Sequence, residues 1–158
     1  MKKLNPEYIK TVAKEVGKCP YFTLLSMGIR DLDWGQSRLE VAIDKKHLQP
    51  FGMVHGGVYA SLIDAAAFWA VYSQIEGEVG MTTVEMKLNY LAPASEGVFI
   101  GKGKSIKVGN TLCLGEASVV DRDGNLLAHG TATMMILKDL KIHSAMPLPP
   151  KFLDEAVG

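Results

Sequence analysis

The sequence predicts an α+β protein in which an antiparallel sheet wraps around one long apolar helix. The segment from His55 to about Gln74 is apolar on most sides, so other elements must cover it. Two strand-like segments precede this helix and four follow it, without the strand–helix alternation that is typical of a parallel sheet. Because one sheet face cannot cover such a helix completely, we expect its remaining apolar surface to meet a second copy of the chain.

The N-terminal part of the chain predicts a separate helix. It runs over residues 6–16, with Asn5 as a suitable N-cap, proline at the first helical position and Gly17 after its end. Cys19-Pro20 then breaks the chain, and one further helical turn is expected at residues 21–25.

Strands are expected on both sides of the long helix. Residues 27–34 and 38–44 form the first two, with a turn at Gly35, and residues 45–54 form a loop before the helix. Residues 83–90 alternate strictly. The alternation puts four side chains on one face, namely Val84, Met86, Leu88 and Tyr90. The other expected strands are 98–108, 111–121 and 126–137, with tight-turn signals at Gly109-Asn110 and Asp123-Gly124.

Length and composition fit one globular domain. The 158 residues are expected to form a single unit, with a core at about 27–138, an N-terminal helix at 5–17 and an irregular, proline-rich tail at 139–158. Lysine and arginine number 17, as do aspartate and glutamate, so no net charge attracts nucleic acid or an anionic membrane. We therefore expect neither of them as a partner.

Other site classes are also disfavoured. Cys19 and Cys113 are far apart, and the histidines show no ligand spacing, so neither a disulfide framework nor a metal site is expected. The apolar stretch 58–75 carries Asp64 near its middle, which would be costly in lipid, so it is interpreted as a buried helix. No apolar segment of a secretory signal follows the first lysines, and a cytoplasmic location is expected.

Asp64 is the first candidate for chemistry, because it is the only formally charged residue between His55 and Glu76. A carboxylate in an apolar helix costs several kcal/mol unless it has partners or a function. Two interpretations follow. Asp64 could accept a hydrogen bond from a nearby group, such as the hydroxyl of Ser61, or it could act in catalysis.

The helix start, His55-Gly56-Gly57, is the second candidate. Two glycines allow a ligand to approach the backbone closely, and free amides at a helix N-terminus favour a partial negative charge. A polarised carbonyl needs such an environment. The alternative is a loop–helix junction that only requires special backbone dihedral angles.

Together these features resemble the hotdog-fold acyl-CoA thioesterases. Residues 49–57 read QPFGMVHGG, Asp64 follows His55 by nine residues, and Thr82-Thr83 leads into Tyr90-Leu91-Ala92-Pro93. The chain looks most similar to the branch that includes the phenylacetate-pathway and 4-hydroxybenzoyl-CoA thioesterases. The resemblance covers about residues 39–137 and implies a sheet wrapped around the central helix.

The resemblance also implies roles for individual residues. Asp64 matches the catalytic carboxylate, which acts either as nucleophile or as the general base that activates water. Gly56 matches the residue whose backbone N–H polarises the thioester carbonyl, and His55 and Gly57 flank it. Gln49 matches an Asn or Gln that orients water or substrate. Thr83 matches a Ser or Thr that assists hydrolysis, with Thr82 as a competitor.

A bound CoA would bring phosphates to the protein. Relatives hold the CoA tail on the strand pair that here carries three lysines and a turn, namely Lys102, Lys104, Lys107, Gly109, Asn110 and Thr111. Alternation puts Lys102 and Lys104 on the same strand face. The competing interpretation is that these lysines form an ordinary solvated edge.

The expected function is hydrolysis of an acyl-CoA to a free acid and CoA, with no cofactor beyond the CoA of the substrate. Gly56 and Asp64 are eight residues apart, or about 12 Å along one helix, so both can act on one thioester only if they come from two copies. A homodimer is therefore the expected functional unit, with two dimers associating. The alternatives are a hotdog dehydratase or hydratase, whose differently spaced motifs are not found, and a non-catalytic acyl-CoA-binding module. The acyl group cannot be inferred.

Overall fold

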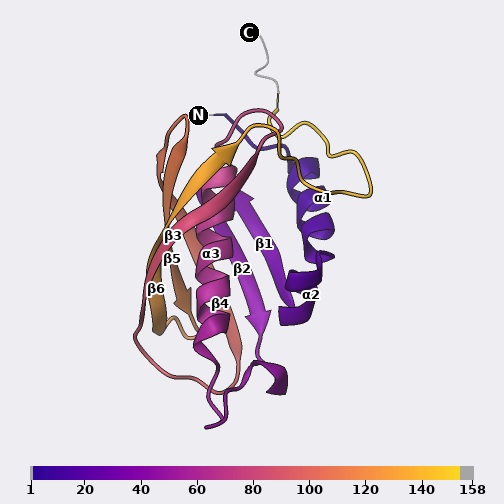
Figure 1. Ribbon diagram of the computed structural model, residues 1–158. Helices are drawn as coiled ribbons and strands as arrows, with labels where there is room; N and C mark the ends of the chain where they lie inside the picture. The colour runs from indigo at the N-terminus through magenta and orange to yellow at the C-terminus, as the bar shows by residue number, and fades with distance from the viewer. Residues whose placement is uncertain (1, 154–158) are drawn as a thin grey trace.

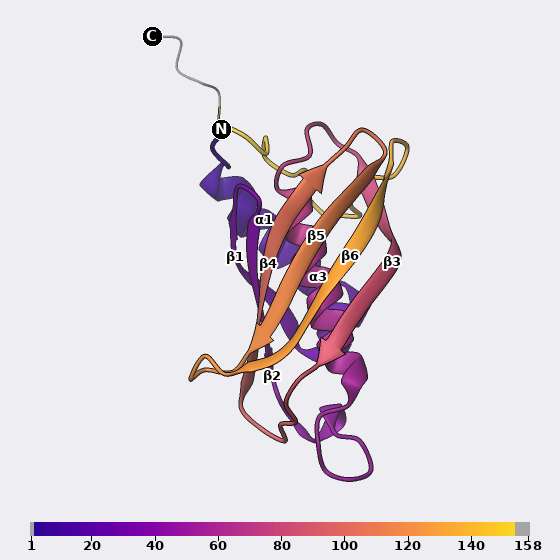
Figure 2. The same ribbon diagram turned by 90° about the vertical axis from the view of Figure 1, so that its left-hand side faces the viewer.

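A six-stranded antiparallel sheet curves around the helix α3 (Gly56–Tyr72) in the computed structural model, which describes residues 2–153. The strand order is β1-β2-β4-β5-β6-β3, and Figure 2 shows the sheet with α3 behind it. The predicted α+β class is therefore confirmed. The strands are β1 (Met27–Asp33), β2 (Gln36–Ala42), β3 (Gly80–Tyr90), β4 (Val98–Val108), β5 (Leu112–Val120) and β6 (Leu126–Leu137).

The helix α3 lies directly against the backbone of the sheet because three glycines leave room for it. A Cβ added to Gly103 would lie 2.0 Å from the Ala66 carbonyl oxygen, and one added to Gly115 would lie 2.9 Å from the Ala67 carbonyl oxygen. The third, Gly101, makes room for a helix side chain, because an added Cβ would lie 2.8 Å from Cγ of Leu62. This close approach fixes the height of α3 above the sheet.

Three predicted strand boundaries are wrong at the start of the sheet. Strand β1 ends at Asp33, and β2 covers Gln36–Ala42 rather than 38–44. Residues 43 and 44 leave the sheet because Asp44 begins a short 3₁₀ helix, η1 (Lys45–His47), which the sequence did not predict. The backbone N–H of Asp44 donates to Nδ1 of His47 over 2.9 Å, and the Asp44 carboxylate accepts from the N–H of Lys45.

The predicted strict alternation in β3 is also wrong, because the strand contains a β-bulge at Val84. Thr83 lies opposite Met134 and Met86 lies opposite Ala132, and both of these partners are fully buried. Directly paired residues share a face, so Thr83 and Met86 both point toward the helix although they are three residues apart. Val84 does not join this face and is half exposed.

The chain ends meet near the C-terminal end of α3, at the top of Figure 1. The helix α1 (Pro6–Gly17) begins as predicted, with the Asn5 side chain accepting from the N–H of Glu7 over 3.0 Å, and α2 (Pro20–Leu25) follows it. The irregular segment after β6 returns to the N-terminus, where Leu4 and Phe152 form a β-bridge. Residues 154–158 of the expected tail lie outside the described residues.

The helices described between residues 2 and 153 include none with the length and apolar character needed to cross a membrane. The long helix α3 ends at Tyr72, slightly before the predicted Gln74, and the backbone N–H of Ser73 caps it by donating to the Trp69 carbonyl.

The Gly103→Ala variant should be much less stable than the wild type. Its Cβ would overlap the Ala66 carbonyl and the Ser37 hydroxyl, and overpacking of this kind costs about 1–3 kcal/mol. Urea unfolding at one fixed protein concentration measures the change in free energy. Gly17→Ala is the matched control, because nothing lies within 4 Å of its added Cβ, and it should change stability by less than about 1 kcal/mol. Equal stability of the two variants would contradict the close packing of α3.

Candidate active site

Asp64 lies half-buried in the middle of α3 and is held by a threonine of the neighbouring edge strand β3. The hydroxyl of Thr83 donates to Oδ1 of Asp64 over 2.7 Å. No other hydrogen bond to the carboxylate comes from the residues that the structure describes. One carboxylate oxygen is therefore fixed by a neutral donor, and the other remains available to accept a proton or a water molecule.

The structure separates Thr83 from its competitor Thr82. The β-bulge at Val84 turns Thr83 toward α3, whereas Thr82 is exposed and makes no side-chain hydrogen bond within residues 2–153. Ser61, the other expected partner of Asp64, is used elsewhere. Its hydroxyl donates to the Gly57 carbonyl over 2.7 Å and lies 2.6 Å from the Tyr21 hydroxyl.

The N-terminus of α3 presents one free amide among its first three. The N–H of Gly57 donates to Nδ1 of His55 over 2.8 Å, and the N–H of Val58 donates to the His55 carbonyl over 3.0 Å. The N–H of Gly56 has no partner among the described residues. His55 is thus the N-cap that occupies the amide of Gly57, and the amide of Gly56 keeps its capacity to bind an oxygen.

A cavity of about 360 Å³ opens at this end of the helix. Gln49 and Gly56 both line it, as the motif predicts, but the Gln49 side chain accepts a hydrogen bond from the N–H of Phe51 in its own loop. Tyr90, for which the sequence indicated no role, also lines the cavity, and its ring would lie 3.1 Å from a Cβ added to Gly56. The only indication in the sequence that Tyr90 belongs to this site was its place in the motif that ends at Pro93. The remaining lining residues are Met53, Val54, Tyr59, Leu91, Ala92 and Pro93.

Tyr59 supports the floor of this cavity. Its ring packs against Phe99 with 4.9 Å between centroids and against Tyr90 with 5.8 Å. Burial raises the pKa of the Tyr59 phenol, so the hydroxyl keeps its proton at neutral pH. The cavity wall beside Gly56 is therefore aromatic and uncharged.

The three lysines lie apart from Asp64 in a single chain. Lys102 and Lys104 are exposed on the face of β4 that points away from α3, opposite Ser118 and Glu116. A second bulge, at Ile106, brings Lys107 onto the same outer face, opposite Leu114.

The expected turn residues lie beyond the end of β4. Asn110 and Thr111 are exposed there, next to the less exposed Gly109. Lys107 shares a small depression with Gln74 and Glu76, which follow the C-terminal end of α3. Within one chain, Lys107 and Gly56 are thus found at opposite ends of the helix, whereas Lys102 lies between two glycines that face its middle, at Leu62 and Ala66.

Within residues 2–153, no group of three or more histidine, cysteine, aspartate or glutamate side chains lies close enough together to hold a metal ion.

Comparisons with known proteins place this arrangement in a family. A family profile described as "Thioesterase superfamily" matches residues 51–128. The chain is 30% identical over 105 residues to the 1,4-dihydroxy-2-naphthoyl-CoA hydrolase of Escherichia coli. The aligned region covers 65% of this chain and 77% of the hydrolase. The chain belongs to the thioesterase superfamily. It is also 26% identical over 129 residues to mouse acyl-coenzyme A thioesterase 13, covering 79% of this chain and 91% of that one.

A solved structure agrees with the assignment. A thioesterase family protein from Silicibacter pomeroyi superposes with a TM-score of 0.74 at 32% identity, covering 83% of this chain and 98% of that one. The hotdog fold that the sequence resemblance implied is therefore confirmed. By its family, this superfamily member is a thioester hydrolase.

The Thr83→Val variant should hydrolyse thioesters more slowly, because valine keeps the shape but cannot donate to Asp64. A hydrogen bond to a charged group is worth about 1.5–3 kcal/mol, so its loss should lower kcat about 10- to 100-fold. Thr83→Ser, which keeps the donor, should stay within a few-fold of the wild type. Thiol release from the best thioester substrate measures both rates. Equal losses in the two variants would show that packing, and not the hydrogen bond, matters.

Proposed function

We propose that this protein hydrolyses an acyl-CoA thioester, with Asp64 as the general base or the nucleophile and the Gly56 N–H polarising the carbonyl. The observation that carries the proposal is the 2.7 Å hydrogen bond that holds Asp64, the one carboxylate of an otherwise apolar helix. The names of the mouse and Escherichia coli relatives, an acyl-coenzyme A thioesterase and a naphthoyl-CoA hydrolase, support CoA thioesters as the substrate class.

The two possible routes share the same electrostatic requirement. As a base, Asp64 takes a proton from water while the oxygen of that water attacks the carbonyl carbon. As a nucleophile, its oxygen attacks the carbon, and water then hydrolyses the resulting anhydride. In each case the carbonyl oxygen becomes negative, the C–S bond breaks, and CoA leaves as a thiolate that takes up a proton. The unpartnered amide of Gly56 is suited to stabilise that negative oxygen.

Asp64→Asn should fold normally and lose most hydrolysis, since the amide is nearly isosteric but is neither a base nor a useful nucleophile. A lost general base typically costs a factor of about 100 or more. Thiol release from a panel of acyl-CoAs measures the loss, and Asp31→Asn, an exposed change on β1, serves as control. Near-wild-type turnover by Asp64→Asn would contradict the assigned role. A wild type that binds acyl-CoA without releasing thiol would instead be a binding module.

We further propose that each active site combines two subunits. Eight residues of α3 separate Gly56 from Asp64, which is about 12 Å along the helix and too far for both to act on one carbonyl. Two surface features support the packing of a second copy of the chain beside α3. The stripe of α3 that carries Gly57, Ser61 and Asp64 is less buried than the rest of the helix. The strand β3 lies at the edge of the sheet, with its outer side unpaired. An antiparallel neighbour would bring its own Gly56 to Asp64.

Complementation tests this shared site. Asp64→Ala and Gly56→Val should each be inactive, and refolding them together should restore activity to about half of the wild-type value per mixed dimer. Both defects then fall in one site, and the other site is intact. Differently tagged subunits and a pull-down verify that mixed dimers form. Mixed dimers that form but stay inactive would show that each site is built within one chain.

A further inference from the structure

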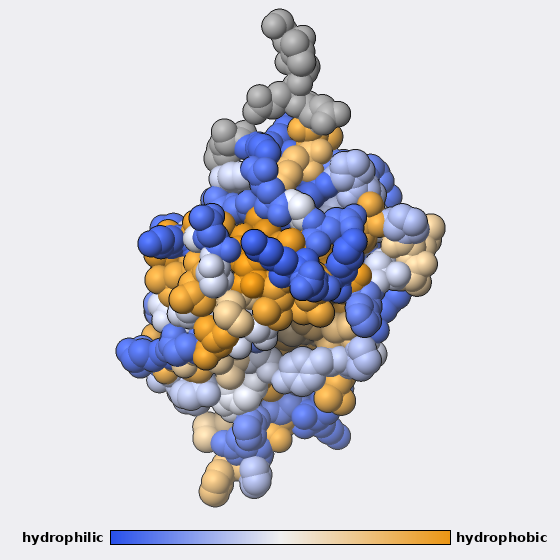
Figure 3. All heavy atoms as spheres, turned by 45° about the horizontal axis from the view of Figure 1, so that its top comes forward, coloured by the Kyte–Doolittle hydropathy of each residue, from blue (hydrophilic) through white to orange (hydrophobic). Residues whose placement is uncertain are grey.

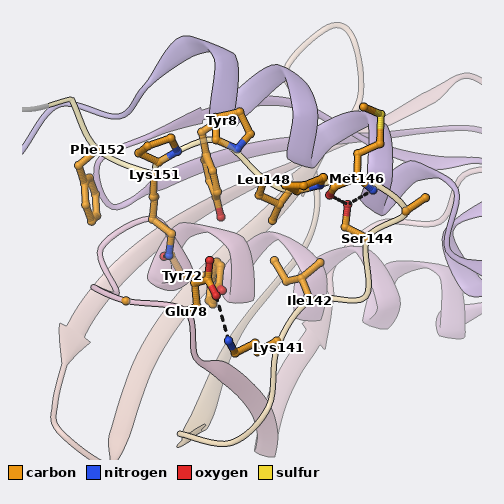
Figure 4. A pocket seen from close by; sticks show the side chains of 15 residues that line it. Tyr8, Tyr72, Glu78, Lys141, Ile142, Ser144, Met146, Leu148, Lys151 and Phe152 are labelled. Carbon is orange, nitrogen blue, oxygen red and sulfur yellow. Dashed lines mark hydrogen bonds and ion pairs between the residues drawn. The ribbon is translucent and has the colours of Figure 1, made fainter.

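A second cavity, with a volume of about 720 Å³, lies at the end of α3 opposite Gly56. Tyr72 at this end is 16 residues from Gly56, or about 24 Å along the helix. Figure 4 shows the lining side chains, which come from α1, the end of α3, the loop at residues 77–78 and residues 141–152. Most of these side chains lie outside residues 51–128, so this cavity is separate from the proposed thioesterase site.

The cavity is lined mainly by apolar groups. Ile142, Met146 and Leu148 project from the irregular segment after β6, which also contributes three prolines. Figure 3, which looks onto this end of the molecule, shows hydrophobic atoms gathered between hydrophilic ones. At the cavity, Lys141 and Glu78 form an exposed ion pair with 3.1 Å between the charged atoms. A volume and lining of this kind are typical of sites for small, largely apolar ligands.

Tyr8 gives the cavity an unused hydrogen-bond donor. The residue is only 4% exposed, and Figure 4 shows its hydroxyl end pointing into the cavity. No residue within 2–153 forms a hydrogen bond with this hydroxyl. Burial raises the pKa of the phenol, so the group stays protonated and can donate. The hydroxyl oxygen is accessible from the cavity, because no fully buried side-chain oxygen or nitrogen among the described residues lacks a hydrogen-bond partner. It can therefore donate to an acceptor on a ligand.

The half-buried Lys151 gives the cavity a positive charge that pairs with no carboxylate of residues 2–153. Its Nζ donates to the carbonyls of Tyr72, over 3.1 Å, and Ile75, over 2.8 Å, and lies 3.7 Å from the centre of the Tyr72 ring. Among the described residues, no carboxylate lies within 4.0 Å of it. Burial lowers its pKa to about 8, so the amine is mostly charged at pH 7. The two carbonyls and the ring bind the ammonium group without neutralising it, so an anion in the cavity would supply its counter-charge.

We propose that this cavity binds a free carboxylic acid with an apolar chain, whose carboxylate lies between the Tyr8 hydroxyl and the Lys151 ammonium group. The chain would then pack against Ile142 and Leu148. A single carboxylate matches the one positive charge and the one hydroxyl donor of this cavity, whereas a polyphosphate would need more cations. A neutral alcohol would leave Lys151 without a counter-charge.

Isothermal titration calorimetry with sodium octanoate at pH 7 tests the proposal. The wild type should bind octanoate at least about tenfold more tightly than 1-octanol, which has the same chain without the charge. Tyr8→Phe keeps the ring but removes the donor, and Lys151→Met keeps the length but removes the charge. Each should weaken octanoate binding about tenfold or more, as expected for a lost hydrogen bond to a charged group. The matched control Lys141→Met, at the exposed ion pair, should stay within about twofold.

Octanoate is also the acid that hydrolysis of octanoyl-CoA would release, so the titration is repeated on Asp64→Asn. If Asp64→Asn binds octanoate with wild-type affinity and Tyr8→Phe binds it more weakly, octanoate lies in this cavity and not at Asp64. This conclusion does not depend on the proposed thioesterase activity. Circular dichroism verifies that each variant folds. Lys151→Met removes the donor to the carbonyls near the end of α3, and if this variant unfolds, the octanoate affinity of Tyr8→Phe decides whether the proposal holds. Wild-type octanoate affinity in Tyr8→Phe, or equal affinity for octanoate and 1-octanol, would overturn the proposal.

Discussion

The contact of α3 with the backbone of the sheet is the constraint on which the rest of the structure depends. Gly103 and Gly115 have no room for a side chain, and on the helix the facing positions are alanines. This small-residue contact lets one sheet surround a helix that is apolar on most sides, and it holds the helix at a fixed height. The distance from Asp64 to Thr83 follows from that height, so the packing of the core and the geometry of the candidate site are inseparable.

One helix thus carries two chemically distinct groups that cannot meet within a chain. The free amide of Gly56 depends on the capping geometry of His55, which occupies the amide of Gly57. The carboxylate of Asp64 depends on the mid-helix contact with β3. Because a helix is rigid, the separation of the two groups is fixed by their spacing in sequence. A two-subunit site is the simplest way to use both groups on one thioester.

The segments outside the family-matched region add a second environment at the other end of the helix. The segment after β6 is tied to the N-terminal strand-like residues by backbone hydrogen bonds, including Asn5 N–H to the Lys151 carbonyl over 2.8 Å. This arrangement places the amine of Lys151 against the last carbonyls of α3, where a cation is favourable. The same core fold therefore presents a smaller cavity beside Gly56 at one end of α3 and a larger one, which contains the amine of Lys151, at the other.

The sequence by itself determined the α+β class, the buried helix and the isolation of Asp64, because these follow from local periodicity and composition. It also located Gly56, since a glycine at a helix start is a local signal. Only the tertiary structure decided that Thr83 rather than Thr82 contacts Asp64, because a bulge depends on pairing with β6. The position of Tyr8 and Lys151 in one cavity was equally hidden, since these residues are 143 positions apart and come together only through the fold.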